Sequence, residues 1–266
     1  MNKLSIIKIG GNIIDDTSKL EKFLLDFSQL KSSKILVHGG GKVATQISAS
    51  LGIEAKIVDG RRITDSETLK VVTMVYAGLI NKNMVAKLQS FSCNAIGLTG
   101  ADANTIPATK RPAVTTDYGF VGDIDTSLLH IESLKLFLDN NMTPVFAPIT
   151  HDGKGQLLNT NADTIASALA VSLAKHFETR LLYCFEKKGV LKDINDENSV
   201  INEISLNEYA ALKENGTISQ GMIPKIDNAF DAINKGVKSV FICHADELLN
   251  IINAGEKKGT KLFKEN

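Results

Sequence analysis

Residues Leu4–Asn12, LSIIKIGGN, combine an apolar run with one lysine, Lys8, and end in two glycines, Gly10 and Gly11. An apolar run that breaks into Gly–Gly predicts a strand followed by a tight loop, whose backbone N–H groups can come close to a ligand. Residues 34–41, KILVHGGG, repeat this arrangement and lead into a helical pattern. Because anions bind where N–H groups and a helix dipole converge, two such loops beside a lysine predict a phosphate or carboxylate site.

Apolar runs of strand length alternate with segments of helical period along most of the chain. Residues 64–67, TDSE, fit a capping box at the start of a long helix that reaches about residue 88. The period is lost between residues 101 and 125, where Val114–Thr116 and Phe120–Val121 resemble the strands of a short hairpin. Repeated strand–helix alternation predicts an α/β fold with an open, mostly parallel sheet and helices on both faces. Further strands are expected at 34–38, 55–58, 95–98, 144–147, 180–185, 239–243 and 260–263, with a helix at 246–252.

Composition limits the classes of function. The chain has 266 residues with 30 Lys+Arg and 30 Asp+Glu, so no net charge attracts nucleic acid or a membrane surface. We find no signal peptide ahead of the first strand and no apolar stretch of the roughly 18 residues that a membrane span needs. Cys93, Cys184 and Cys243 lie in apolar runs, which indicates buried free thiols in a reducing compartment. We therefore expect a cytoplasmic globular protein without nucleic-acid or membrane partners.

Single motifs leave several interpretations open. Residues 39–44, GGGKVA, satisfy the G-x-G-x-x-A pattern of a dinucleotide site, with Asp59 near the position of a ribose-binding acid. An earlier strand with its own glycine pair weakens that interpretation, because the dinucleotide fingerprint normally follows the first strand. Lys8 alone could be a solvated edge-strand lysine, and Lys225 could be a surface residue. The five histidines show no spacing typical of metal ligands, so no metal site is predicted from protein ligands alone.

Five motifs occur together in one order: IKIGG at 7–11, VHGGG at 37–41, DGRRIT at 59–64, LNTNAD at 158–163 and GMIPK at 221–225. In this order they resemble the amino acid kinase family, most closely its branch that phosphorylates N-acetylglutamate. The resemblance runs from the first strand to the last and implies a three-layer αβα sandwich with two lobes. The lobe at 1–176 would bind the acylated amino acid and form a homodimer, and the lobe at 177–266 would bind ATP.

The resemblance also implies roles for individual residues. Lys8 and Lys225 would neutralise the transferring phosphoryl group, and Asp163 would orient both lysines. Donors and substrate ligands complete the implied site: Gly10 and Gly11 for phosphate, and Gly40, Gly41, Arg62 and Asn159 for the acylated amino acid. The implied reaction needs ATP with Mg²⁺, which bridges the β and γ phosphates. A glutamate-like γ-carboxylate is already ionised near neutral pH (a typical pKa is about 4.3), so this chemistry requires no general base.

Some positions depart from the family pattern. Residues 184–190, CFEKKGV, replace a Ser-Asp or Thr-Asp pair common in relatives, so individual ATP contacts are not assigned there. Arg61, Lys110 and Arg111 add positive charge near the expected acyl group. A succinyl cap carries one more carboxylate than an acetyl cap, so we hypothesise that N-succinylglutamate is an alternative substrate. The opposing interpretation is that these three cations are solvated surface charges.

Other functions on the same fold stay open at this point. The acceptor could be carbamate, aspartate, free glutamate or an N-acyl-aminoadipate. A non-catalytic amino-acid sensor should have lost Lys8, Asp163 or Lys225, and all three are present. Because the first strand begins at Leu4, without the additional N-terminal helix of arginine-inhibited relatives, we also expect insensitivity to arginine.

Overall fold

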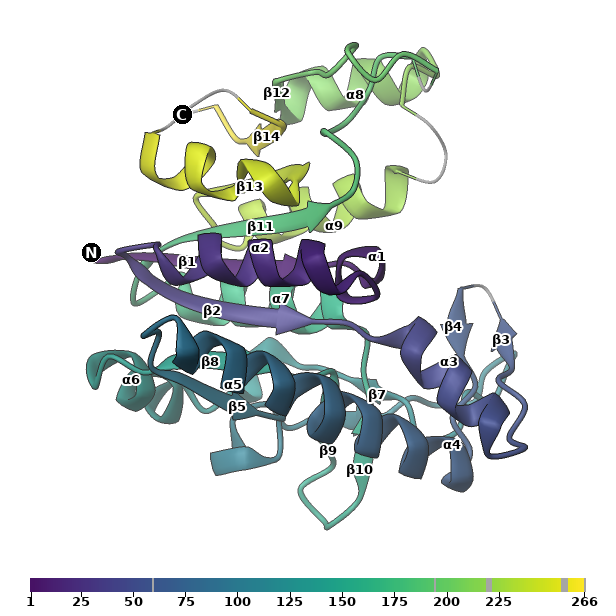
Figure 1. Ribbon diagram of the computed structural model, residues 1–266. Helices are drawn as coiled ribbons and strands as arrows, with labels where there is room; N and C mark the ends of the chain where they lie inside the picture. Colours follow the sequence, from purple (N-terminus) through teal and green to yellow (C-terminus); the bar gives the residue numbers. More distant parts are fainter. Residues whose placement is uncertain (59, 194, 219–221, 255–257, 266) are drawn as a thin grey trace.

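An eight-stranded sheet forms the centre of the computed structural model, with strand order β12-β14-β13-β11-β1-β2-β8-β5 (Figure 1). The structure describes residues 1–58, 60–193, 195–218, 222–254 and 258–265. Neighbouring strands are parallel except β13 and β14, which are antiparallel. This confirms the predicted α/β fold with a mostly parallel sheet. The strands are β1 (Lys3–Ile9), β2 (Ser33–His38), β5 (Ala95–Leu98), β8 (Thr143–Phe146), β11 (Glu178–Phe185), β12 (Glu203–Ser205), β13 (Ser239–His244) and β14 (Thr260–Phe263).

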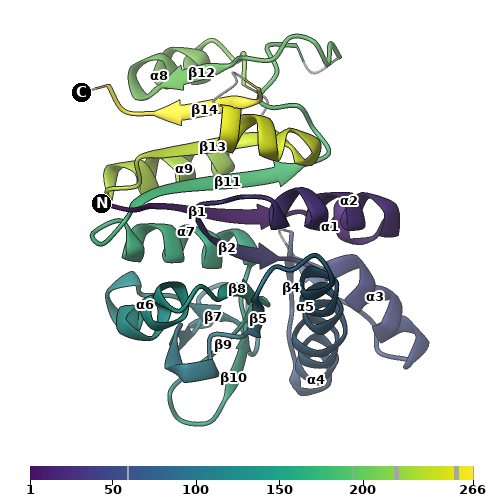
Figure 2. The ribbon, with the colours of Figure 1, turned by 60° about the vertical axis from the view of Figure 1, so that its left-hand side comes forward.

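Helices cover both faces of the sheet, so β1 is buried on both sides. Leu4 and Ile6 pack into the core formed with α6, α7 and α9, whereas Ile7 and Ile9 pack into the core formed with α2, η1 and α5. Figure 2 shows these layers on either side of the strands. The helices are α1 (Gly11–Ile14), α2 (Thr17–Ser28), α3 (Gly41–Ser50), α4 (Ser66–Val72), the π-helix η1 (Thr73–Ile80), α5 (Asn81–Ser90), α6 (Ile131–Asp139), α7 (Ala162–Leu173), α8 (Leu206–Glu214) and α9 (Ile223–Asn234).

Within the described residues, three two-stranded hairpins lie outside the main sheet. They are β3 (Ile57–Val58) with β4 (Arg61–Arg62), β6 (Thr109–Lys110) with β7 (Gly122–Asp123), and β9 (Ile149–His151) with β10 (Leu157–Asn159). The predicted strand at 55–58 is therefore shorter and does not join the main sheet. The hairpin predicted at 114–116 and 120–121 was wrong in position, because the pairing lies farther out, at 109–110 and 122–123.

The predicted helix from 64 to about 88 is present as the continuous series α4, η1 and α5. Its N-cap is Asp65, whose side chain accepts a hydrogen bond from the Thr68 N–H at 2.8 Å, so the capping box starting at Thr64 was wrong by one residue. Thr64 instead pairs its backbone with Gly119. The predicted helix at 246–252 consists of a short 3₁₀ turn, η4 (Ala245–Glu247), and a π-helical segment, η5 (Asn250–Ala254).

The three cysteines are free and buried, as predicted. Within the part of the chain that the structure describes, we find no helix with both the length and the apolar character that a membrane span requires. Two residues of the sequence motifs, Asp59 and Gly221, lie outside the described residues.

Candidate functional site

The two-residue period of β1 decides where Lys8 points. Lys8 shares a face with Leu4 and Ile6, and that face packs against α7. Its side chain is 10% exposed, and its Nζ lies 2.8 Å from Asp163 Oδ1 in the first turn of α7. Asn161 fixes that turn, because its side chain caps α7 by accepting hydrogen bonds from the Asp163 and Thr164 N–H groups. A buried lysine is thus paired with a carboxylate at the carboxyl edge of the sheet.

Lys225 comes to the same place from the first turn of α9. Its Nζ lies 4.0 Å from the centroid of the Phe185 ring, and Lys8 Nζ lies 5.0 Å from the same centroid. The pKa of Lys225 is lowered, mainly by burial of its ammonium group. The nearby carboxylates of Asp163 and Glu186 raise this pKa, whereas the positive charge of Lys8 lowers it further. The structure therefore brings together Lys8, Asp163 and Lys225, which the sequence motifs had predicted as one group.

A polar network joins the loops that follow β1 and β2 to the end of β11. Asn12 Nδ2 donates a hydrogen bond to Glu186 Oε1 at 2.8 Å, and Lys42 Nζ donates to Asn12 Oδ1. Lys42 Nζ also lies 3.5 Å from Asp15 Oδ2. These contacts hold both glycine loops beside the lysine cluster.

The glycines of the first loop have different roles. The Gly10 N–H donates to the Cys184 carbonyl oxygen at 3.1 Å, and the role of Gly10 as a phosphate donor stays a prediction. A Cβ at Gly10 would lie 3.1 Å from Phe185 Cδ1, which makes Gly10 a close-packing position. Gly11 begins α1, and a Cβ there would meet nothing within 4 Å, so its backbone is accessible to a ligand.

The second glycine loop needs glycine for both conformation and space. Gly40 has φ of +152°, and a Cβ there would lie 2.4 Å from Ile80 Cδ1 on η1. Gly41 begins α3, whose first backbone hydrogen bond runs from the Ala44 N–H to the Gly40 carbonyl at 3.0 Å. The N–H groups ahead of that bond point out of the helix end, as an anion site requires.

Arg62 and Asn159 lie on the side of the second loop. Arg62 Nη2 donates to the Gly41 carbonyl at 2.9 Å and to Thr45 Oγ1 at 2.7 Å. Its Nη1 is buried and has no hydrogen-bond partner among the described residues. Asn159 Nδ2 donates to Thr64 Oγ1 at 3.0 Å, close in the chain to Arg62. A buried guanidinium nitrogen without a partner is suited to a carboxylate ligand.

His38, which ends β2, is part of the structure of the sheet edge and carries no charge near neutral pH. Burial lowers its pKa to about 4, although its hydrogen bond to Gly39 opposes the shift. Its Nδ1 donates to the Gly39 carbonyl at 2.7 Å, and Asn81 Nδ2 donates to its Nε2 at 3.2 Å. The site thus contains a histidine without offering it as a general base, which agrees with chemistry on an ionised acceptor.

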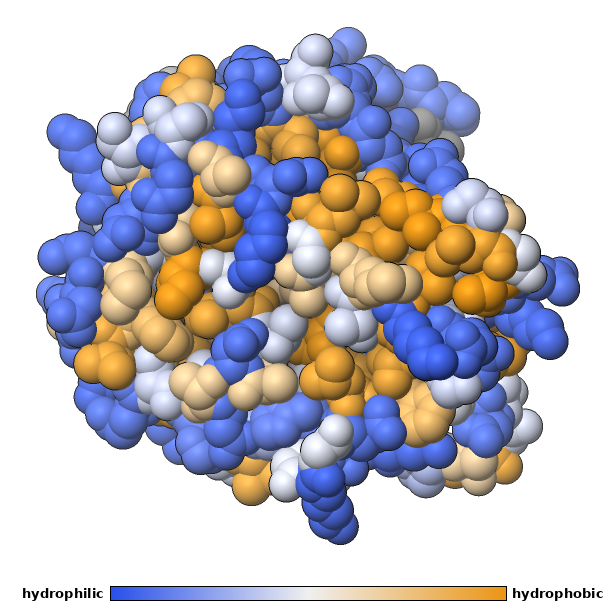
Figure 3. Space-filling view, turned by 60° about the horizontal axis from the view of Figure 1, so that its bottom comes forward, coloured by the Kyte–Doolittle hydropathy of each residue, from blue (hydrophilic) through white to orange (hydrophobic). Residues whose placement is uncertain are grey.

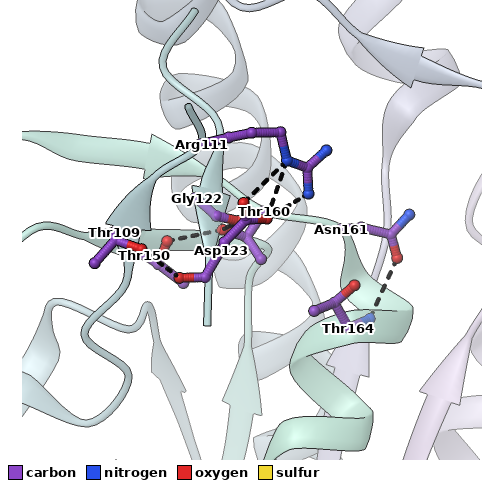
Figure 4. A network of polar contacts seen from close by, with 8 residues as sticks. All are labelled: Thr109, Arg111, Gly122, Asp123, Thr150, Thr160, Asn161 and Thr164. Atoms are coloured by element: carbon purple, nitrogen blue, oxygen red, sulfur yellow. Dashed lines mark hydrogen bonds and ion pairs between the residues drawn. The ribbon is translucent and has the colours of Figure 1, made fainter. Parts of the chain in front are cut away.

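Two of the additional cations near the expected acyl group are engaged elsewhere. Arg111 binds both carboxylate oxygens of Asp123, with Nε at 3.0 and 3.1 Å (Figure 4). Thr109 and Thr160 donate to the carbonyls of Asp123 and Gly122, which fixes the same segment. Lys110 Nζ lies 5.1 Å from the Phe120 ring centroid. Arg111 is therefore paired with Asp123, although its Nη1, like that of Arg62, is buried without a hydrogen-bond partner among the described residues, and Arg61 is exposed.

The carboxylates of the site fit a magnesium ion that arrives with a nucleotide. Asp163 and Glu186 supply hard oxygen donors beside the lysines, and the described residues contain no group of three His, Cys, Asp or Glu side chains that could hold a metal. Mg²⁺ is usually bound by one or two carboxylates together with substrate phosphates. When bound, it would neutralise charge on the phosphate oxygens.

Sequence reasoning missed Asn12 and the contacts of Phe185. Asn12 directly follows the glycine pair, so its position beside the motif could have identified it as a residue of the site. Phe185 was noted only as a departure from the family pattern. Nothing in the spacing of the sequence relates it to Lys225, which lies forty residues later.

Comparisons with known proteins agree with this arrangement. The family model described as "Amino acid kinase family" matches residues 3–244. The chain is 61% identical over 263 residues to the acetylglutamate kinase of Cytophaga hutchinsonii, covering 98% of this chain and 99% of that protein. It is 52% identical over 263 residues to the acetylglutamate kinase of Parabacteroides distasonis, covering 99% of this chain and 100% of that protein.

Solved structures share the fold. N-acetylglutamate synthase from Neisseria gonorrhoeae, complexed with coenzyme A and N-acetyl-glutamate, matches with a TM-score of 0.83 at 23% identity. The match covers 100% of this chain and 60% of that one. Giardia carbamate kinase matches with a TM-score of 0.70 at 14% identity, covering 99% of both chains. Sequence and fold lead to one conclusion: the chain belongs to the amino acid kinase family.

Proposed function

We propose that this protein transfers the γ-phosphoryl group of ATP to the γ-carboxylate of N-acetyl-L-glutamate, a step of arginine biosynthesis. The observation that carries the proposal is the cluster of Lys8, Asp163 and Lys225 at the carboxyl edge of the sheet. Arg62, with its unpartnered buried Nη1, supports a carboxylate substrate. The names of relatives that are 61% and 52% identical over nearly the full chain support the same acceptor.

In the proposed reaction, an oxygen of the γ-carboxylate attacks the γ-phosphorus. The bond between that phosphorus and the β–γ bridging oxygen breaks, and ADP leaves. Lys8 and Lys225 stabilise the negative charge on the transferring group, and Asp163 orients Lys8. The N–H groups of Gly11 and Gly41 donate to the phosphoryl oxygens and the substrate. Arg62 and Asn159 bind the α-carboxylate and the amide of the acceptor.

We assign ATP to the lobe at 177–266 and the acceptor to the lobe at 1–176. Lys225 lies in the first turn of α9, so the positive end of a 12-residue helix points to the place where the phosphates would lie. Glu186 and Asn12 are hydrogen-bonded between the two lobes, beside the same place. The two substrates would meet at the lysine cluster.

We also propose a cytoplasmic homodimer that forms through the π-helical segment η1. Met74 and Leu79 on this segment are 57% and 48% exposed, which is unusual for large apolar side chains on one helix. Figure 3 shows hydrophobic residues gathered over the side of the molecule that carries α4 and α5. A second copy of the chain would bury this surface.

Steady-state kinetics with an acceptor panel test the proposed substrate. The panel contains N-acetylglutamate, N-succinylglutamate, free glutamate, aspartate, carbamate and N-acetyl-aminoadipate, and ADP release is measured with saturating MgATP. Because Arg111 is neutralised by Asp123, we expect N-acetylglutamate to have the highest kcat/KM. A higher value for any other acceptor would reassign the substrate. Absence of ADP release with all of them would contradict the kinase function itself.

A further inference from the structure

The Phe185 ring lies close to both lysines of the site. It ends β11, and its ring stacks on that of Tyr183 with centroids 6.3 Å apart. Lys225 Nζ and Lys8 Nζ lie 4.0 and 5.0 Å from its centroid, within the distance at which the face of an aromatic ring attracts a cation. Gly10 leaves the space that the ring occupies, because a Cβ there would lie 3.1 Å from Phe185 Cδ1.

The chemistry of these contacts differs from that of an ion pair. A carboxylate would also hold a lysine, but it would neutralise the charge and compete with the phosphoryl group. An aromatic ring attracts the ammonium group through its quadrupole and leaves the full positive charge available to a phosphate. Lys8 has Asp163 as a second partner, whereas the contact observed for Lys225 among the described residues is the Phe185 ring. The two lysines also repel each other, as the effect of Lys8 on the pKa of Lys225 shows.

We propose that Phe185 is a positioning residue for phosphoryl transfer, which holds the ammonium group of Lys225 at the site without neutralising it and gives Lys8 a second contact beside its ion pair with Asp163. This inference rests on the proposed function and extends it to a residue outside the recognised motifs. When MgATP binds, the ammonium groups of one or both lysines would contact its phosphates instead of the Phe185 ring. Gly10 serves the same arrangement by accommodating the ring beside the first glycine loop.

Three variants separate this role from packing. Phe185→Leu keeps an apolar side chain but removes the π face, and Phe185→Tyr keeps the π face. Phe263→Leu is the matched control, because Phe263 is also half-buried at the end of a strand and has Lys261 Nζ 4.8 Å from its ring centroid. We expect Phe185→Leu to lower kcat by about 10-fold, with both KM values changed less than about 3-fold. Phe185→Tyr should stay within about 2-fold of wild type, and Phe263→Leu should not change the kinetics.

NMR of protein labelled at lysine ¹³Cε gives a readout that does not depend on turnover. The resonances of Lys8 and Lys225, assigned with Lys→Arg variants, should be shifted upfield by the ring current of Phe185 in the free protein. They should lose this shift in Phe185→Leu and on addition of MgATP to the wild type. Equal kcat values for the Leu and Tyr variants, or lysine resonances without a ring-current shift, would overturn the proposal. If wild-type protein turns over none of the acceptors, the proposed function fails, and the NMR result alone decides the role of Phe185.

Discussion

Lys8 and Lys225 carry the same charge but are held in place by different contacts. This difference decides how a mutational test of the two lysines is designed. Lys8→Ala would leave Asp163 without its 2.8 Å partner, so lost stability would mix with lost catalysis. Lys225→Ala removes a cation that forms no ion pair with the described residues, so it is the cleaner variant. Loss of one donor that faces transition-state charge costs about 2.7–4 kcal/mol, so we expect kcat to fall by about 10²–10³-fold.

The control for this comparison is Lys261→Ala, which removes a lysine that also lies over an aromatic ring, and is ion-paired with Glu203 at 3.4 Å, but lies at the opposite edge of the sheet. Its kcat should equal that of the wild type. Steady-state kinetics with varied ATP measure all three proteins, and KM should change less than kcat for Lys225→Ala. Near-normal kcat in Lys225→Ala would remove this lysine from the mechanism.

His38 makes the stability of the protein depend on pH. Its pKa is about 4 in the folded protein, below its ordinary value of 6.5, so the unfolded chain binds a proton more readily between these values. The free energy of unfolding should therefore be constant above pH 6.5 and fall as the pH drops toward 4, by up to about 1.4 kcal/mol per pH unit from this residue. Urea unfolding from pH 4.5 to 7.5 measures it, with ¹⁵N-histidine NMR as the site-specific check. A His38 resonance that titrates near pH 6.5 would contradict the assignment.

At the scale of elements, two helix caps offer a matched comparison. Asn161 caps α7 and Asp16 caps α2, each helix has 12 residues, and each cap side chain accepts two backbone hydrogen bonds. Replacing either by alanine should cost about 1 kcal/mol of stability. Only Asn161→Ala should also lower kcat, because the same turn holds Asp163 against Lys8. Equal kcat values in the two variants would show that the cap does not position Asp163.

The strands and helices differ in how well they could be predicted from the sequence. The apolar run predicted the strand that contains Lys8, and Asn161, which caps α7, lies in the motif LNTNAD at 158–163. The hairpin in residues 101–125 was misplaced because β-branched residues such as Val114 indicate strand propensity, whereas Val114 is 85% exposed. The two strands instead pair at 109–110 and 122–123, beside the Arg111–Asp123 ion pair. This ion pair joins the two sides of the hairpin, so the strand propensity of single residues does not predict it.

At the scale of the whole molecule, the parallel sheet brings distant segments of the chain to one edge. The ends of β1, β2 and β11 lie side by side because these strands are neighbours in register, with Lys8 opposite Tyr183 and Val37. Strand–helix alternation predicted this fold, and the resemblance to the amino acid kinase family implied that the motifs converge. The side-chain contacts of Phe185 and the neutralisation of Arg111 depend on tertiary packing and could not be predicted.

The proposed dimer is tested through its apolar surface. Met74→Asp places a charge on η1, which should convert the dimer to a monomer because an unpaired charge is costly to bury. Leu136→Asp on α6 is the control, since Leu136 is similarly exposed, at 60%. Light scattering coupled to size-exclusion chromatography should give twice the chain mass for wild type and Leu136→Asp. A monomeric wild-type protein, or a dimeric Met74→Asp, would contradict the assigned interface.

The proposed function requires that the lysine cluster catalyses formation of an acyl phosphate on the γ-carboxylate of N-acetylglutamate. The most direct measurement traps this product with hydroxylamine and identifies the hydroxamate by tandem mass spectrometry. We predict a γ-hydroxamate of N-acetylglutamate that requires MgATP and is reduced by about 10²–10³-fold in Lys225→Ala. No hydroxamate from the wild-type protein, or one formed at the α-carboxylate, would contradict the proposed function.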